Sequence, residues 1–174
     1  GHEQSLIIDA DTGRTRSQRT DGATDRVDFR LDQTRGRNVE LHRTHPSTTS
    51  FSVEDLMVAQ SAVANYGATT ASMWVHSADG DHYKARLLKT MTERDRHQWY
   101  LASYRAIQEL QRALPDLDPE EARLLGPHFA MLAMRRRGTA RYAYSLGARQ
   151  QRIIRRLGSD RVREVVDAAM QEMS

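Results

Sequence analysis

The segment 40–56, ELHRTHPSTTSFSVEDL, gathers side chains that are able to hold a metal ion. His42, His45, Ser52 and Asp55 place two imidazoles, a hydroxyl and a carboxylate within fourteen residues. A catalytic zinc typically keeps three protein ligands and one water, and a nearby carboxylate takes the proton of that water. Because the chain has no cysteine, histidine, carboxylate and water are the ligands available. The segment therefore indicates hydrolytic metal chemistry if these side chains meet in the fold.

These residues are expected where a strand runs into a helix. The stretch NVELH, 38–42, alternates Val39 and Leu41 with polar residues, which predicts a half-buried strand. Ser52 opens the sequence S-V-E-D, and an acidic residue three positions after a serine resembles a capping box. We expect a helix to begin at Ser52 and to end at Gly67. A strand end beside a helix N-terminus would hold the ligands on rigid backbone.

The first ninety residues predict the order β-β-β-α-β-β. EQSLIID (3–9) is expected to be a strand that leads into a hairpin, 14–25 a polar loop, RVDFRLD (26–32) a strand, and 68–88 two strands around an ADGD turn. The remainder predicts helices at 92–114, 119–137, 139–157 and 159–173. The expected fold class is α+β, with a first domain at 3–90 and a helical extension at 91–174.

His45-Pro46, followed by Ser52 and Asp55, resembles the signature of the JAB/MPN (JAMM) metalloprotease superfamily. Its pattern is a distant glutamate, then His-x-His-Pro, about seven residues and Ser-x-x-Asp. The start E-x-x-L-I-I-D-x-x-T-G is also similar to the family's first strand, which would make Glu3 the glutamate. The resemblance covers roughly residues 3–88, and the helical extension lies outside it.

The resemblance implies a cytidine-deaminase-like fold and a zinc ion held by two histidines and Asp55. It also implies Glu3 as general base and Ser52 as oxyanion donor. Family members cleave isopeptide bonds to ubiquitin-like proteins or process precursors, so a protein substrate or a ubiquitin-like partner is expected. Bacterial relatives associated with phages and polymorphic toxins share the fold. The resemblance therefore also implies a role as a bacterial effector as one interpretation.

One position departs from the family pattern, because Arg43 stands where the first histidine of His-x-His belongs. Arginine is always protonated and has no lone pair for zinc. His42 is one position early, and neighbouring strand residues face opposite sides unless a bulge intervenes. Two alternatives stay open. The first is a zinc peptidase, catalytically impaired or completed by His42 beside His45 and Asp55. The second is a metal-free pseudoenzyme that binds a protein, with Arg43 paired to Asp55 or Glu3.

Two further groups are weaker candidates. His76 and His82 flank the ADGD turn, where metal binding is less favoured than a structural role. Residues 133–158 hold eight arginines and no acidic residue, with tyrosines between them. This pattern suits phosphate contacts and base stacking, an acidic protein surface or anionic lipid. It also suits a solvated surface paired with acidic residues of neighbouring helices. The run Arg135, Arg136 and Arg137 is the candidate binding site for nucleic acid, the weakest of the proposed functions.

Composition narrows the class of protein. Hydrophobic residues make up 39% and charged residues 28% of the 174 residues, with a formal net charge of +3, as in a globular protein. No apolar run approaches the ~20 residues needed to cross a bilayer, and no signal-peptide pattern is visible. We therefore expect no membrane span and a cytoplasmic location, in the protein's own cell or, for an effector, in a target cell.

Overall fold

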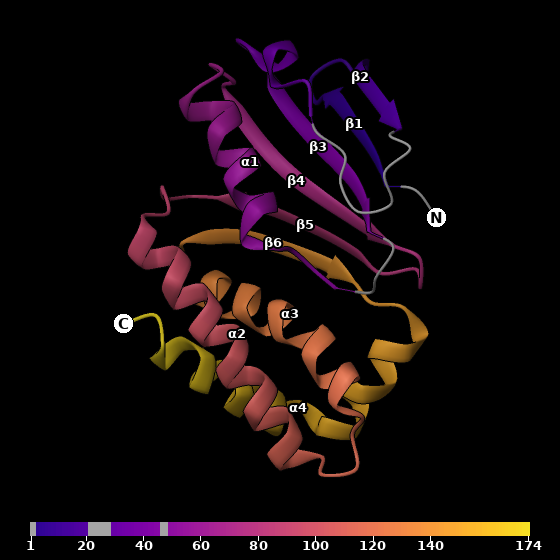
Figure 1. Cartoon of the computed structure of the whole chain (residues 1–174), viewed down its shortest axis with the longest axis vertical. Coiled ribbons are helices and arrows are strands. Elements are labelled where there is room, and N and C mark those ends of the chain that lie inside the picture. The colour runs from indigo at the N-terminus through magenta and orange to yellow at the C-terminus, as the bar shows by residue number, and fades with distance from the viewer. Residues whose placement is uncertain (1–2, 21–28, 46–48) are drawn as a thin grey trace.

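In the computed structural model, a mixed sheet carries helices on one face (Figure 1). The structure describes residues 3–20, 29–45 and 49–174. The sheet has the order β2-β1-β3-β4-β5-β6, in which β3 and β4 are parallel and the other neighbours antiparallel. The strands are β1 (Gln4–Asp9), β2 (Thr15–Thr20), β3 (Asn38–His45), β4 (Thr70–Ser77), β5 (His82–Leu87) and β6 (Ala140–Ser145). The helices are the 3-10 helix η1 (Leu31–Thr34) and the α-helices α1 (Val53–Ala64), α2 (Glu93–Ala113), α3 (Pro119–Arg137) and α4 (Ala148–Gln171). The fold class is α+β, as expected.

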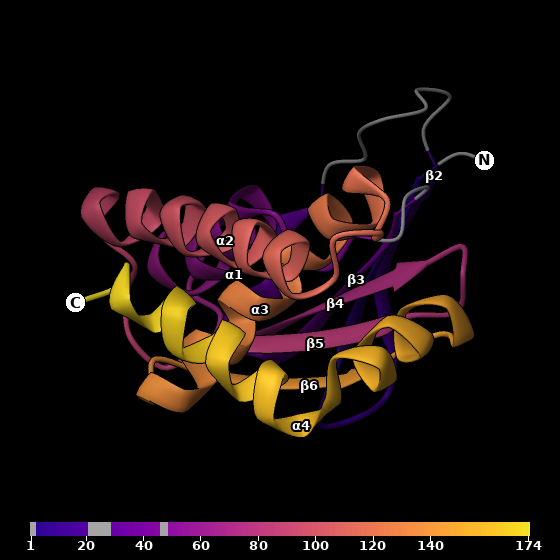
Figure 2. The same cartoon turned by 90° about the horizontal axis from the view of Figure 1, so that it is seen from below.

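The two faces of the sheet differ in what covers them. Helix α1 packs on β4 and β5, α3 packs on β6, and α2 and α4 pack against α3 (Figures 1 and 2). On the packed face Met73, Val75 and Tyr83 are fully buried. The residues between them along the strands, such as Trp74 and Lys84, point to the opposite face and are only half-buried. This opposite face is called the open face below.

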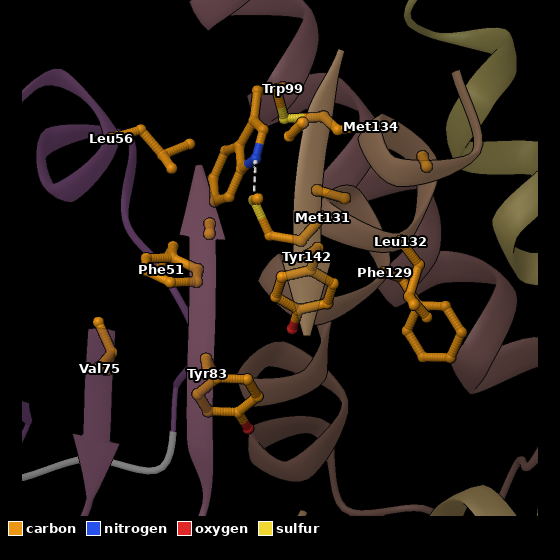
Figure 3. Close-up of a cluster of buried hydrophobic side chains, with 14 of the residues drawn as sticks. Phe51, Leu56, Val75, Tyr83, Trp99, Phe129, Met131, Leu132, Met134 and Tyr142 are labelled. Atoms are coloured by element: carbon orange, nitrogen blue, oxygen red, sulfur yellow. Dashed lines mark hydrogen bonds between the residues drawn. The ribbon is translucent and has the colours of Figure 1, made fainter. Parts of the chain in front are cut away.

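The core joins the sheet to the helices that follow residue 91. Trp99 on α2 donates its indole N–H to the sulfur of Met131 on α3, at 3.5 Å (Figure 3). Phe51, which precedes α1, meets the ring of Tyr142 on β6 edge-on, with the ring centroids 6.2 Å apart. Burying aromatic side chains from both halves of the chain in one cluster contributes strongly to folding. The helices of residues 91–174 therefore share a hydrophobic core with the sheet.

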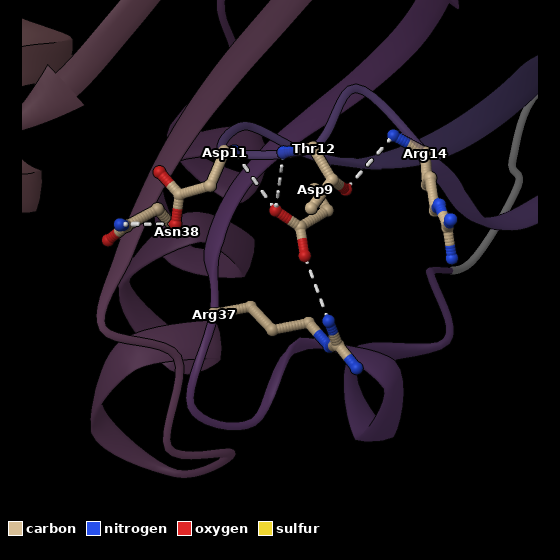
Figure 4. A network of polar contacts seen from close by, with 6 residues as sticks. All are labelled: Asp9, Asp11, Thr12, Arg14, Arg37 and Asn38. Atoms are coloured by element: carbon tan, nitrogen blue, oxygen red, sulfur yellow. Dashed lines mark hydrogen bonds and ion pairs between the residues drawn. The ribbon is translucent and has the colours of Figure 1, made fainter.

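A carboxylate fixes the turn that joins β1 to β2. Asp9 accepts hydrogen bonds from the backbone N–H groups of Asp11 and Thr12, and Arg37 donates to its other oxygen at 2.8 Å (Figure 4). The Arg37 hydrogen bond lowers the pKa of Asp9 below its usual value. Asp9 thus turns the chain back into the hairpin that the ADTG sequence predicts, and Arg37 ties this hairpin to the start of β3.

Three of the predicted elements are wrong in type. Segment 139–157 was expected to be helical, but its first part is strand β6 and α4 begins at Ala148. The loop expected at 14–25 contains strand β2. The strand expected at 26–32 is not formed in its described part, where η1 begins at Leu31; residues 26–28 lie outside the described residues. Gly158 breaks the last helix with a φ of 77°, so the break predicted there is confirmed as a kink inside α4.

Tertiary pairing explains the two missed strands. In β6, Ala140 and Tyr142 are buried while Arg141 and Ala143 are exposed, which is a period of two within an arginine-rich stretch. Strand β2 is polar on both faces and pairs with β1 as an edge strand, so it lacks the apolar alternation that identifies strands. As a result, a strand from beyond residue 90 completes the sheet formed by the first part of the chain.

Among the described residues, no helix combines the length and apolar character required to cross a membrane.

Candidate functional site

The end of β3 and the first turn of α1 bring Arg43, His45 and Asp55 together. Arg43 and His45 lie on the packed face of the sheet, because they continue the alternation of the buried residues Val39 and Leu41. Asp55 is the third residue of α1 and is fully buried, at 0% exposure. The strand-to-helix junction expected from the sequence is therefore present, and it holds His45 and Asp55 beside each other.

Asp55 is surrounded by hydrogen-bond donors. The guanidinium of Arg43 donates from Nη1 to Oδ1 at 2.7 Å. The backbone N–H and the hydroxyl of Ser52 donate to Oδ2 at 2.9 and 3.0 Å, and Nε2 of His45 lies 3.4 Å from the same oxygen. The side chains of Arg43 and His45 are only 12% and 11% exposed. Both carboxylate oxygens of Asp55 are thus occupied by protein groups in a site with little solvent access.

These contacts determine the charge of Asp55. Burial raises the pKa of this carboxyl, but the hydrogen bond from His45, the charge of His45, the Ser52 N–H and the charge of Arg43 together lower it below its usual value. Asp55 is therefore ionised at neutral pH despite its complete burial. A buried anion of this kind requires a cationic partner, and Arg43 is permanently charged.

Ser52 is the N-cap of α1, as its position in the sequence predicts. Its hydroxyl accepts the N–H of Asp55 at 3.2 Å, and the Asp55 carboxylate accepts the N–H of Ser52, so both halves of a capping box are present. The same hydroxyl donates to Asp55 Oδ2. Its donor and acceptor functions are thus engaged within the first turn of α1, and the role of oxyanion donor stays a prediction.

Glu3 lies just before β1 and is buried, at 7% exposure. Ser5 is the register partner of Arg43, and the N–H of Gln4 donates to the hydroxyl of Thr44 at 2.8 Å. Extending this antiparallel register brings Glu3 level with His45 on the packed face. The strand pairing therefore brings Glu3 to the same end of the sheet as Arg43, His45, Ser52 and Asp55, which are called the Asp55 site below. This is the placement that the resemblance implies.

His42 lies on the other side of the sheet. Strand β3 pairs with β4 in unbroken register from Asn38 to His45, so no bulge brings His42 round to His45. Instead, the His42 ring stacks on the rings of Trp74 and His76 on the open face. This arrangement places His42 on the face opposite to His45 and Asp55, because neighbouring residues of a regular strand face opposite ways, and its role as a ligand beside them stays a prediction.

The Asp55 site therefore does not fit a three-ligand zinc centre. His45 and Asp55 are the two potential ligands that meet, and the cation of Arg43 lies against the carboxylate that zinc would need. Phe29 adds to the enclosure, with its ring centroid 5.4 Å from the Arg43 guanidinium carbon. In the ranges that the structure describes, no group of three or more His, Asp or Glu side chains is positioned to hold a single metal ion.

The arginine run at the end of α3 has partners within the protein. Arg135 donates to the backbone carbonyl of Tyr142 at 3.2 Å, and its guanidinium lies 5.6 Å from the Tyr144 ring centroid. Arg136 forms an ion pair with Asp167 of α4, and Arg137 donates to the carbonyl of Met173. The pair of Arg136 and Asp167 corresponds to the alternative in which the arginines pair with acidic residues of neighbouring helices. The nucleic-acid function stays a prediction without added support.

Sequence reasoning missed two polar clusters that the fold assembles. One is a row of histidines on the open face, formed by His42, His76 and His82. The other is the fully buried His128 on α3, whose Nδ1 lies 2.6 Å from the hydroxyl of Tyr142. The signals were a period of two in 138–146 and the facing positions of His76 and His82 across the ADGD turn. The histidine row and the contact of His128 with Tyr142 can be recognised only once the strand pairing is known.

No protein-family model matches the chain, and neither the curated proteins nor the solved structures contain a significant match to it.

Proposed function

We propose that this chain is a metal-free JAB/MPN-like module that acts by binding a protein partner. The carrying observation is the 2.7 Å contact between Arg43 Nη1 and Asp55 Oδ1 within a buried site. In the resemblance described above, Asp55 would be a zinc ligand and position 43 a histidine. Here the guanidinium supplies the positive charge that the buried carboxylate needs.

Electrostatics favours this ion pair over a zinc ion. To admit zinc, Asp55 would have to release Arg43, whose side chain is only 12% exposed. Leaving a largely buried cation without its partner costs about 3–5 kcal/mol, as measured for broken buried pairs. Zinc would also bind next to the permanent positive charge of Arg43. The balance therefore lies with the metal-free state of this site.

A module without the zinc ion would lack peptidase activity but would keep its surface for binding a protein. A catalytic zinc lowers the pKa of its bound water and so produces the nucleophile of this peptidase class. With Arg43 on Asp55 and the Ser52 hydroxyl engaged in the helix cap, the site lacks that means of activating water. Binding is the activity that we propose for such a metal-free module, and a ubiquitin-like protein is the partner class that the resemblance suggests.

Zinc content tests the proposal. The protein is purified without chelator in a His82→Ala background, so that exposed histidines on β4 and β5 add no zinc of their own. We expect zinc well below one equivalent per chain, unchanged by His45→Ala. Arg43→His should raise the content toward one equivalent, because a histidine at 43 would lie on the same face as His45 and Asp55.

Two results would overturn the proposal. The first is one zinc per chain in the His82→Ala background that disappears with His45→Ala. The second is cleavage of isopeptide-linked diubiquitin by the wild-type protein that is abolished by His45→Ala. Arg149→Met, which alters an exposed arginine on α4, serves as the control for purification and handling in both assays.

A further inference from the structure

Three histidines form a hydrogen-bonded row across the open face of the sheet. Nδ1 of His42 on β3 lies 2.8 Å from Nε2 of His76 on β4, and Nδ1 of His76 lies 2.8 Å from Nδ1 of His82 on β5. At the other end, Nε2 of His42 lies 3.4 Å from a carboxylate oxygen of Glu40. The row is separate from the Asp55 site, because it occupies the opposite face of the sheet.

The contacts of the row define one consistent set of protonation states. If His42 donates its Nε2–H to Glu40, its Nδ1 is an acceptor, and His76 must donate to it from Nε2. The Nδ1 of His76 then accepts the Nδ1–H of His82. A metal ion would take the place of this proton once His82 carries its proton on Nε2 instead, so the two Nδ1 atoms already face the position of a shared ion.

The backbone holds these two nitrogens in place. His76 and His82 are direct partners in the antiparallel pairing of β4 and β5. The turn between them is fastened by Asp81, which accepts the Ser77 hydroxyl at 2.9 Å and the N–H of Gly147 at 2.6 Å. A Cβ at position 147 would lie 2.3 Å from the carbonyl oxygen of Asp79, so only glycine permits this close approach. The hairpin that carries the two histidines is thus anchored to the start of α4.

We propose that His76 and His82 bind one divalent transition-metal ion that prefers imidazole ligands, such as Zn²⁺, through their Nδ1 atoms. Two nitrogens bound to a tetrahedral zinc at 2.0–2.1 Å are about 3.3 Å apart, so the rings need to separate by only about 0.5 Å from their present contact. His82 is exposed, which gives an ion access from solvent and leaves positions for water or for a group from a partner.

Glu40 and His42 act as the supporting shell of this site. A metal-bound histidine usually donates its other ring N–H to a carboxylate, a carbonyl or a water, which fixes its orientation and increases its basicity. Here His76 Nε2 has this partner in His42, which is in turn fixed by Glu40. Lys84, 3.5 Å from Glu40, opposes the ion with one positive charge.

Zinc titration by isothermal calorimetry at pH 7.5, on protein first stripped with chelator, tests this site. We expect one Zn²⁺ per chain, and a loss of affinity of about a hundredfold or more in His76→Ala and in His82→Ala. His42→Ala and Glu40→Gln should weaken binding about tenfold, the lower end of the effect of removing an orienting partner. His97→Ala, an exposed histidine on α2, is the matched control and should bind like the wild type. Circular dichroism checks that each variant is folded.

The outcomes separate this site from the Asp55 site. Wild-type protein that binds Zn²⁺ no more tightly than His76→Ala and His82→Ala would overturn the present proposal and leave the proposed function intact. Zinc that survives His82→Ala but is lost with His45→Ala would overturn both. Zinc that is lost with His82→Ala and retained with His45→Ala supports the histidine pair as its ligands.

Discussion

Replacing Arg43 with methionine tests whether the ion pair with Asp55 is essential to the site. Methionine retains much of the apolar length of arginine and removes the guanidinium that donates to Asp55 at 2.7 Å. The Asp55 carboxylate would then remain buried, with the Ser52 donors and His45 as its described neighbours. We expect the free energy of unfolding to fall by about 3 kcal/mol, the lower end of the range for breaking a buried pair, because these neighbours remain.

The assay is urea denaturation, with thermal unfolding as a second measurement. A loss of about 3 kcal/mol corresponds to a decrease in Tm of roughly 6–12 °C for a chain of this size. Arg149→Met is the matched control, since Arg149 contacts Glu121 at 3.1 Å and its side chain is 48% exposed. Breaking this exposed pair should cost about 1 kcal/mol or less. A loss for Arg43→Met as small as that of the control would refute the assigned role of the ion pair.

The lowered pKa of Asp55 predicts how the effect of Arg43→Met on the free energy of unfolding changes with pH. The pKa of Asp55 is lowered in the folded protein, so its ionisation stabilises the fold above the unfolded pKa of about 3.9, and this contribution is lost as pH falls through the folded value. Without Arg43, the folded pKa of Asp55 should lie higher than in the wild type, although His45 and Ser52 still lower it. The destabilisation by Arg43→Met should therefore shrink as the pH falls through the folded pKa of Asp55 in the variant. Arg43→Met combined with Asp55→Asn should be more stable than the sum of the two single changes.

Two further predictions concern the cap of α1 and the buried His128. Ser52→Ala should lower the free energy of unfolding by about 2–4 kcal/mol, because it removes both the α1 cap and the hydroxyl hydrogen bond to the buried Asp55 carboxylate. Thr92→Ala at the exposed cap of α2 is its control in urea denaturation, and a Ser52→Ala loss no larger than that of the control would contradict the hydrogen bond to Asp55. For His128, burial followed by the charge of Arg135 lowers the folded pKa to about 3, so the unfolded chain binds the proton first and stability falls as pH drops below about 6.5. His128→Gln should therefore lose about 2 kcal/mol less than the wild type between pH 7.5 and pH 5, and an equal loss would contradict the neutral buried state.

Local signals predicted the elements around the site better than the contacts within it. The capping residues Ser52 and Asp55 lie only three positions apart in sequence, so the start of α1 could be predicted from the residues alone. The alternation of Val39 and Leu41 predicted β3, and the parity of the strand then placed Arg43 on the packed face and His42 on the open face. One of the two partners named in advance for Arg43, Asp55, accepts a hydrogen bond from it in the structure.

What escaped prediction depends on pairing between distant segments. Strand β6 forms by pairing with β5, and its period of two over six residues is a weak signal within the arginine-rich stretch 133–158. The row of His42, His76 and His82 arises because β3, β4 and β5 are neighbours in the sheet. Sequence spacing alone does not predict which strands are neighbours. The sequence therefore grouped only His76 and His82, which flank the ADGD turn.

The most direct test of the central claim is a crystal structure of the protein grown with Zn²⁺, with anomalous data collected above the zinc edge. The account predicts Arg43 in contact with Asp55 and no anomalous peak between Asp55 and His45. A zinc peak there, bound by Asp55 and Nε2 of His45 with Arg43 turned away, would contradict it.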